Sequence, residues 1–189
     1  MPKRFITASE LLKDSFSLGI KILESDFRPT FIIAVWRGGA PIGIAVQEVL
    51  DVCGVTTQHI AIRTSSYEGI EQRSKSVKVH GLGYVIDTIK AEDNLLIVDD
   101  VHDSGLSVAE LIKQIKGRSG DNAPQSIKVA TVYFKPSQSK VSDAPDYYLH
   151  ETNDWLVFPH ELQGLTAEEL LENKPELGHI VQQLKNFQQ

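Results

Sequence analysis

Cysteine and long apolar runs are nearly absent from this chain. Cys53 is the single cysteine among 189 residues, so no disulfide can form within the chain, which fits a reducing compartment. No apolar run approaches the roughly 18 residues that a membrane-spanning helix needs. The first residues lead into polar, helix-forming sequence rather than into an apolar signal peptide. We therefore expect a soluble cytoplasmic protein with no membrane partner.

Positive charge is also scarce. The chain has 19 Lys and Arg residues against 25 Asp and Glu residues, a net charge of −6 and a pI of about 5.5. A protein that holds nucleic acid mainly through its phosphates needs the opposite sign of charge, so we expect no nucleic-acid partner. Hydrophobic residues make up 41% and charged residues 23%, and these ordinary proportions predict a packed core.

Short runs of branched apolar residues alternate with stretches of helical period. The tetrad Leu-Leu-Ile-Val at residues 95–98 is apolar throughout, which is typical of a strand covered on both faces in a parallel sheet. Thr7 and Glu10 have the spacing of a capping box at the start of a helix. The order of strand, helix and strand predicts an α/β fold with a mostly parallel sheet. Strands are expected at residues 30–35, 58–63, 77–80, 95–98 and 127–134, and helices from Thr7 to about residue 23, from about residue 42 to 52 and over 107–116.

Two segments outside this alternation have patterns of their own. Residues 68–76 are polar and lie between two strand-like runs, which indicates a mobile loop at the tip of a long hairpin. Short aromatic pieces follow the last predicted strand at residues 147–149 and 155–158. Thr166 and Glu169 form a second capping-box pair, so the C-terminal tail is expected to be helical.

The most informative stretch is residues 95–107. Asp99 and Asp100 follow the apolar tetrad at its carboxyl end, where open α/β sheets bind their ligands. A hydroxylic, glycine-containing turn and a helix start come next, so backbone N–H groups and the positive end of a helix dipole converge where a phosphate fits. The alternative is that Ser107 only caps its helix together with Glu110, and that the two aspartates are surface residues of a loop.

These residues resemble the signature of the type I phosphoribosyltransferases. That signature is four apolar residues, two acidic residues, two variable positions, an acidic or hydroxylic residue, Ser or Thr, Gly, a variable residue, and Ser or Thr. Residues 95–107 match every fixed position, and His102, at a variable one, is expected to be a loop residue. The resemblance implies that Asp99 and Asp100 serve the ribose hydroxyls of phosphoribosyl pyrophosphate (PRPP) and its metal ion. It further implies that its ribose 5′-phosphate is held by Asp103, Ser104, Gly105, Leu106 and Ser107.

Two other stretches are similar to parts of the same family. Trp36-Arg37-Gly38-Gly39 stands where the family binds pyrophosphate in a glycine turn, with Trp36 in place of the more usual small residue. On its own this sequence could equally be an ordinary strand-to-helix turn. Ser65-Ser66-Tyr67 resembles the flexible loop of the 6-oxopurine branch, which closes over the reacting centre and excludes water. The resemblance thus places pyrophosphate at Arg37, Gly38, Gly39 and Ser66 and gives Tyr67 a catalytic role.

Base recognition is implied by two more segments. Lys135 follows a predicted strand, and Trp155-Leu156-Val157 comes about twenty residues later, as in bacterial xanthine-guanine and hypoxanthine phosphoribosyltransferases. In those enzymes the lysine meets the 6-oxo group, the aromatic residue stacks on the purine, and the backbone that follows recognises the base edge. The alternatives are that Lys135 is a solvated strand end and that Trp155 is a core residue.

The resemblance also implies a fold, a domain organisation and an activity. The fold would be the type I phosphoribosyltransferase fold, a mostly parallel central sheet flanked by helices with a small hood over the active site. Residues 1–189 would form one domain, with the core at about 28–135, the hood and base-recognition segment at about 135–165 and a helical tail at 166–189. The implied activity is transfer of ribose 5-phosphate from PRPP to a 6-oxopurine in purine salvage, with Mg²⁺ at Asp99 and Asp100 and Asp103 as general base, in a homodimer or homotetramer.

Three alternatives remain at this point. The first is an enzyme of the same fold that acts on adenine or a pyrimidine, although Lys135 favours a carbonyl partner. The second is a non-enzymatic regulator that senses PRPP or a nucleotide, which usually adds a nucleic-acid surface that the net charge does not support. The third is a phosphoryl-transfer site, which leaves residues 104–107 and Trp155 without a role. The six histidines have no spacing typical of a zinc site.

Overall fold

A computed structural model describes residues 3–68 and 75–187. The chain divides into two compact units, a larger one, Leu12–Asn153, and a smaller one that combines Met1–Leu11 with Asp154–Gln189. Within the described ranges no helix has both the length and the apolar character needed to cross a membrane.

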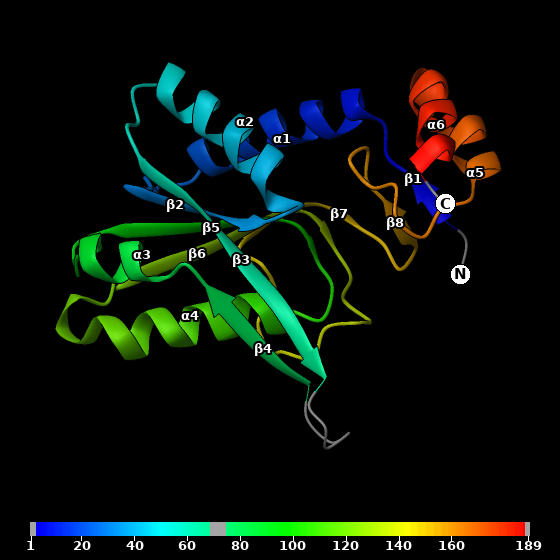
Figure 1. Ribbon diagram of the computed structural model, residues 1–189. Coiled ribbons are helices and arrows are strands. Elements are labelled where there is room, and N and C mark those ends of the chain that lie inside the picture. Colours follow the sequence, from blue (N-terminus) through cyan, green and yellow to red (C-terminus); the bar gives the residue numbers. More distant parts are fainter. Residues whose placement is uncertain (1–2, 69–74, 188–189) are drawn as a thin grey trace. The chain divides into compact units, whose positions relative to one another are not determined.

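The larger unit is built on a six-stranded sheet (Figure 1). Its strands are β2 (Phe31–Trp36), β3 (Gln58–Glu68), β4 (Lys75–His80), β5 (Asn94–His102), β6 (Ser126–Phe134) and β7 (Tyr147–Glu151). They are ordered β4-β3-β2-β5-β6-β7, and every neighbouring pair is parallel except β3 with β4. The predicted α/β fold with a mostly parallel sheet is therefore confirmed.

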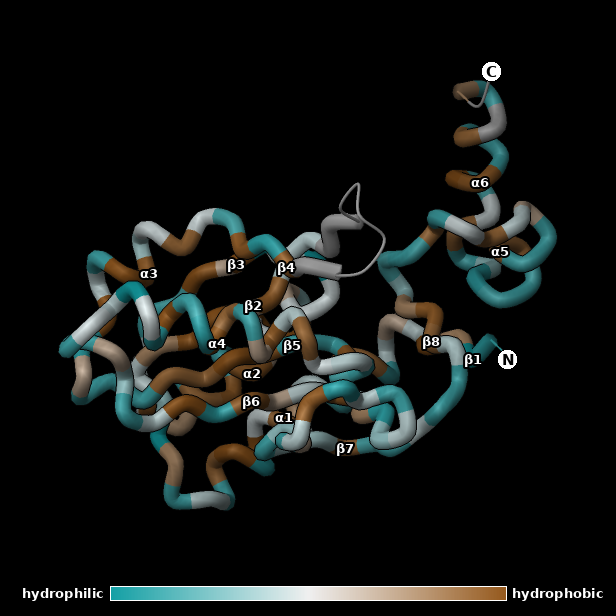
Figure 2. Tube along the Cα trace, turned by 90° about the horizontal axis from the view of Figure 1, so that it is seen from below, coloured by the Kyte–Doolittle hydropathy of each residue, from teal (hydrophilic) through white to brown (hydrophobic). Residues whose placement is uncertain are grey.

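Helices cover both faces of this sheet. They are α1 (Ala8–Leu23), α2 (Gly39–Val52), α3 (Gly83–Thr88) and α4 (Leu106–Ser119), and a short 3-10 turn, Gly120–Asn122, follows α4. In Figure 1, α1 and α2 lie on one side of the sheet and α3 and α4 on the other. Phe31, Ile33 and Val35 of β2 pack in one buried cluster with Val108 and Leu111 of α4. Figure 2, which colours the chain by hydropathy, shows hydrophobic stretches in the region of β2, β5 and β6. Burial of both faces explains why β2 and β5 are apolar at consecutive positions.

The smaller unit joins the two ends of the chain. Its elements are β1 (Lys3–Phe5), β8 (Trp155–Val157), α5 (Ala167–Asn173) and α6 (Gly178–Leu184), with 3-10 turns at Pro175–Leu177 and Lys185–Phe187. β1 and β8 pair in parallel. The capping box of Thr166 and Glu169 is present, and the Glu169 carboxylate also accepts a hydrogen bond from Lys3 Nζ at 2.6 Å. The predicted helical tail is confirmed.

The hairpin and the first capping box are also confirmed. Strands β3 and β4 are antiparallel, and the Glu10 N–H donates to Thr7 Oγ1 while the Thr7 N–H donates to Glu10 Oε2. The boundaries of the expected loop were wrong, because Glu68 pairs with Lys75 inside the ladder. Residues 69–74, the expected mobile tip, lie outside the described residues.

His102 differs from its expected place. It is the last residue of β5, paired with Phe134 of β6, and its side chain is buried. The register with β2 ends at Val98, but β6 continues beside β5 and keeps its backbone hydrogen-bonded. A strand with one remaining neighbour extends past its apolar tetrad, which the hydropathy pattern alone does not show.

Close packing of α2 on β2 gives a stability prediction. A Cβ atom at Gly43 would lie 2.8 Å from the Cβ of Ala34, whereas a Cβ at Gly117 of α4 would meet nothing within 4 Å. We expect Gly43→Ala to lower the free energy of unfolding by about 1–3 kcal/mol through overpacking. Gly117→Ala should raise it by about 0.5–1 kcal/mol through helix propensity alone. Urea unfolding of both variants measures this, and a gain in stability for Gly43→Ala would contradict the packing.

Candidate active site

The carboxyl end of β5 carries two acidic side chains. Asp99 and Asp100 lie one and two residues beyond Val98, where the pairing of β5 with β2 stops. The Asp100 N–H donates to Asp99 Oδ1 at 2.9 Å, and the Val101 N–H donates to Asp100 Oδ1 at 2.7 Å. Both carboxylates are thus fixed by the backbone of their own strand, at the edge of the sheet where ligands of this fold class bind.

The glycine turn between β2 and α2 packs directly against this edge. A Cβ at Gly38 would lie 1.7 Å from Asp100 Oδ2, and a Cβ at Gly39 would lie 2.4 Å from the Val98 carbonyl oxygen. Neither position has room for a side chain, so glycine at both positions has a steric reason. The structure therefore brings the predicted pyrophosphate turn against the predicted ribose pair, with the exposed Arg37 beside it. The peptide bond between Trp36 and Arg37 is cis.

Electrostatics distinguish the acidic pair from surface carboxylates. Burial raises the pKa of Asp99 well above its usual range, and the adjacent charge of Asp100 raises it further. Two neighbouring carboxylates of this kind favour a hard cation or hydroxyl donors. Mg²⁺ in phosphate sites is usually held by one or two carboxylates together with substrate oxygens. The described residues contain no cluster of three or more such ligand side chains, and the role of the pair toward Mg²⁺ stays a prediction.

The turn after β5 leads into α4, and the Leu106 N–H at the helix start donates to Ser104 Oγ at 3.4 Å. Gly105 is the N-cap, with φ of 73°, and the helix starts at Leu106. The alternative that Ser107 caps the helix with Glu110 is wrong, because Ser107 lies inside the first turn and Glu110 accepts from Gln114 Nε2 at 2.9 Å. The first N–H groups of a helix have no intrahelical acceptor. The start of α4 therefore offers backbone donors and a positive dipole end to an anion.

An ion pair connects the ends of β5 and β6. Lys135 Nζ lies 3.1 Å from Asp103 Oδ2, and the Lys135 N–H donates to the His102 carbonyl at 2.9 Å. Lys135 is 9% exposed and Asp103 about half exposed, so the alternative of a solvated strand end is wrong. Sequence analysis missed this pair, although the parallel register of His102 with Phe134 places the next residue of each strand side by side.

The other predicted base-binding residues belong to the smaller unit. Trp155 begins β8 and is 59% exposed, so its alternative as a core residue is wrong, while Leu156 and Val157 are buried. Lys135 belongs to the larger unit, so a base site shared by Lys135 and these residues stays a prediction. An exposed indole at a strand start is nevertheless available to a flat ligand.

Ser66 and Tyr67 are placed by their backbone alone. They lie in β3 and pair with Val77 and Ser76 of β4. Their side chains lie outside what the structure describes, so their pyrophosphate and catalytic roles stay predictions.

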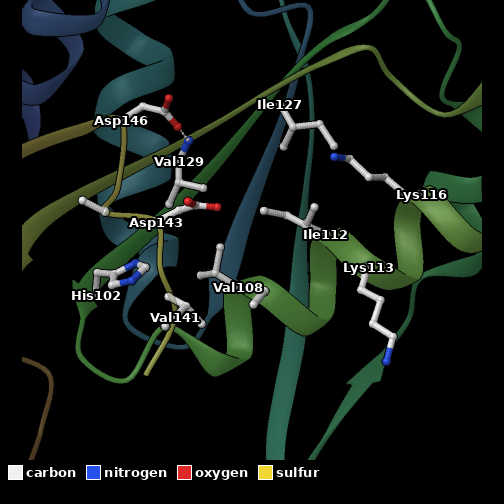
Figure 3. Close-up of a pocket in the computed structure, with 13 residues that line it drawn as sticks. His102, Val108, Ile112, Lys113, Lys116, Ile127, Val129, Val141, Asp143 and Asp146 are labelled. Atoms are coloured by element: carbon white, nitrogen blue, oxygen red, sulfur yellow. Dashed lines mark hydrogen bonds between the residues drawn. The ribbon is translucent and has the colours of Figure 1, made fainter. Parts of the chain in front are cut away.

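A cavity of about 450 Å³ opens between α4 and residues 141–146 (Figure 3). Of the predicted site residues only Gly105 lines it, so this cavity is separate from the acidic pair and the ion pair. His102 also lines it, and burial lowers the pKa of the imidazole. The ring packs edge-on against Phe134, and neither ring nitrogen has a hydrogen-bond partner within the described ranges.

Comparisons with known proteins agree with this geometry. The hypoxanthine-guanine phosphoribosyltransferase of Bacillus subtilis (strain 168) is 28% identical over 178 residues, which cover 93% of this chain and 91% of that protein. A purine phosphoribosyltransferase from Pyrococcus horikoshii has a TM-score of 0.68 and 26% identity, over 88% of this chain and 99% of its own. A hypothetical protein from Neisseria gonorrhoeae, solved with bound ppGpp, has a TM-score of 0.71 over 94% and 96% of the two chains; its 19% identity shows the fold alone.

The family itself follows from a match to most of the chain. The model of the phosphoribosyl transferase domain matches residues 7–163. That range contains the glycine turn, the acidic pair, the start of α4, Lys135 and Trp155. The match confirms the resemblance seen in residues 95–107, and the chain belongs to the phosphoribosyl transferase family.

Proposed function

We propose that this protein is a 6-oxopurine phosphoribosyltransferase of purine salvage. It transfers ribose 5-phosphate from PRPP to hypoxanthine, guanine or xanthine and releases pyrophosphate. The observation that carries the proposal is the Asp103–Lys135 ion pair, 3.1 Å across, next to the acidic pair and the start of α4. The B. subtilis and P. horikoshii relatives, a hypoxanthine-guanine and a purine phosphoribosyltransferase, support a purine base.

Each part of PRPP has a complementary group in the larger unit. The first turn of α4 and residues 103–107, which lie before and within it, suit the ribose 5′-phosphate. Asp99 and Asp100 would accept hydrogen bonds from the ribose hydroxyls and hold Mg²⁺. Arg37 and the backbone of Gly38 and Gly39 would bind pyrophosphate. Mg²⁺ would offset the charge that develops on the departing pyrophosphate.

The ion pair matches one edge of an oxopurine. A 6-oxopurine has its 6-oxo oxygen and one imidazole nitrogen on the same edge. Lys135 Nζ donates to that oxygen, and Asp103 accepts a proton from that nitrogen. The other imidazole nitrogen forms the bond to the sugar as the bond to pyrophosphate breaks, with inversion, and the proton passes to Asp103. In an oxocarbenium-like transition state the protein acts mainly by alignment and electrostatic stabilisation.

Adenine and pyrimidines fit this edge less well. Adenine has an amino group where Lys135 would donate, so two donors would face each other. A regulator that only binds PRPP or nucleotide would not need a carboxylate beside the lysine.

We expect the enzyme to act in the cytoplasm as a homodimer or homotetramer. The exposed side chains of Leu12, Phe16 and Ile20 on α1, spaced one helical turn apart, support self-association.

The activity itself is the first test. With PRPP and Mg²⁺, we expect pyrophosphate release with hypoxanthine, guanine or xanthine, and at least about tenfold lower kcat/KM with adenine and uracil, since one unpaired donor costs about 1–3 kcal/mol. A reaction with excess chelator is the control and should be inactive. PRPP binding without turnover of any base would support the regulator instead.

Removing the charge of Asp103 tests its role as proton acceptor. Asp103→Asn keeps an oxygen that can accept from Lys135 but loses the base, so kcat should fall by about 10² to 10⁴ with PRPP affinity retained. Asp87→Asn, on the exposed side of α3, is the matched control and should behave like the parent. A kcat for Asp103→Asn within about threefold of the parent would exclude the proposed role.

Substitutions of Lys135 and Trp155 should have different effects on the kinetics, one on base selectivity and the other on base affinity. Lys135 supplies a charge-assisted bond worth roughly 1.5–3 kcal/mol to an oxygen, so Lys135→Ala should shrink the oxopurine-to-adenine ratio of kcat/KM. Trp155 stacks on any flat ring for roughly 1–3 kcal/mol, so Trp155→Ala should weaken all bases by similar factors. Steady-state kinetics with hypoxanthine, guanine, xanthine and adenine measures both. An unaltered ratio in Lys135→Ala would remove the 6-oxopurine assignment and leave the PRPP site intact.

A further inference from the structure

Lys174 in the C-terminal tail has an ammonium group enclosed by backbone carbonyls. It follows α5 directly and is 2% exposed. Its Nζ donates to the carbonyl oxygens of Phe158 at 2.6 Å, Pro159 at 3.1 Å and Glu161 at 2.6 Å. A lysine ammonium has three N–H donors, and each has a carbonyl acceptor here.

Burying a lysine ammonium costs free energy unless hydrogen bonds compensate for the lost water. Lysine is almost never fully buried unless it is paired, and burial lowers the pKa of Lys174 while the charges of Glu161 and Glu176 raise it. The three carbonyls belong to a single turn, residues 158–161. That turn is closed by two further bonds, from the Phe158 N–H to Glu161 Oε2 and from the Glu161 N–H to the Phe158 carbonyl, both 3.0 Å. Lys174 therefore holds a whole turn rather than one group.

The turn continues directly from β8. Strand β8, just before the turn, pairs with β1, and the Ile6 N–H donates to the Val157 carbonyl at 2.9 Å. The base-recognition segment is therefore held by β1 along its strand and by Lys174 at its end. Helix α5, which positions Lys174, is itself fixed by its capping box and by the Lys3–Glu169 ion pair at 2.6 Å.

We propose that Lys174 is a positioning residue for base recognition, through its three bonds to the carbonyls of residues 158–161. By fixing that turn, Lys174 fixes the backbone of Leu156 and Val157 and the direction of Trp155 at the start of β8. The inference rests on the proposed function, and it gives the C-terminal tail a role in choosing and holding the base. PRPP recognition depends on residues of the larger unit and does not involve Lys174.

The proposal predicts that loss of the Lys174 bonds changes KM for the purine but not KM for PRPP. Lys174→Met keeps the apolar stem and removes all three donors, so three carbonyls lose their partner and the turn relaxes. We expect KM for the purine to rise at least tenfold, while KM for PRPP stays within twofold. Lys174→Gln keeps two N–H donors and should be intermediate, and Lys174→Arg should restore most of the purine affinity.

The experiment compares these variants with Glu172→Gln. Glu172 lies on the same helix, α5, with its side chain exposed, so the loss of its charge should change neither KM by more than about twofold. Hydrogen–deuterium exchange gives a readout that is independent of activity. Exchange in residues 155–162 should rise in Lys174→Met and not in Glu172→Gln, with melting curves confirming that each variant is folded. If Lys174→Met does not fold, Lys174→Gln carries the same two measurements.

Two results would overturn the inference. One is unchanged exchange in residues 155–162 of the folded variant, and the other is a change in KM of equal size for PRPP and for the purine. A parent protein that transfers phosphoribosyl to no oxopurine would instead remove the proposed function. The exchange measurement would still show whether Lys174 holds the turn, so the two failures are distinguishable.

Discussion

Steric exclusion at Gly38 and Gly39 is the constraint on which the candidate site depends. Because a Cβ at Gly38 would overlap the carboxylate of Asp100, the backbone of the turn and the acidic pair occupy adjacent space. A pyrophosphate at the turn and ribose hydroxyls at Asp100 would then belong to one ligand of the size of PRPP. Any side chain at Gly38 would displace Asp100, so the turn and the carboxylate have to be retained together.

The same edge of the sheet also holds Lys135 in place. Lys135 is 9% exposed, and its Nζ lies 3.1 Å from Asp103 Oδ2. In the proposed enzyme the pair is therefore in place before a base arrives, and its ammonium makes no second hydrogen bond to the described residues. An oxopurine can engage such a pair without first separating it, because one edge of the ring offers an acceptor and a donor side by side. Preorganisation of this kind lowers the cost of alignment in the transition state.

Much of this arrangement was predictable from the sequence, and the exceptions have physical reasons. The apolar tetrad and the signature at residues 95–107 predicted the parallel sheet and the acidic pair. The extension of β5 to His102 depends on β6 as a neighbour, and the Asp103–Lys135 pair depends on register across 32 positions. Lys174 has no sequence signal at all, because its partners are backbone carbonyls that any residue could supply.

The features that the sequence did not predict differ in kind from those that it did. In the proposed enzyme the two kinds serve different substrates, PRPP and the base. The groups proposed to bind the charged parts of PRPP come from short signatures at strand ends, since glycine, aspartate and a helix start act through local backbone geometry. A base has no such charge, and in the proposed enzyme its recognition would need, besides the Asp103–Lys135 pair, the backbone of Leu156 and Val157 held at a fixed position. Holding a backbone needs contacts from elsewhere in the chain, which β1 and Lys174 supply from opposite ends of the sequence. In the proposed enzyme the two terminal segments would therefore contribute to base recognition together with the residues that would touch the purine.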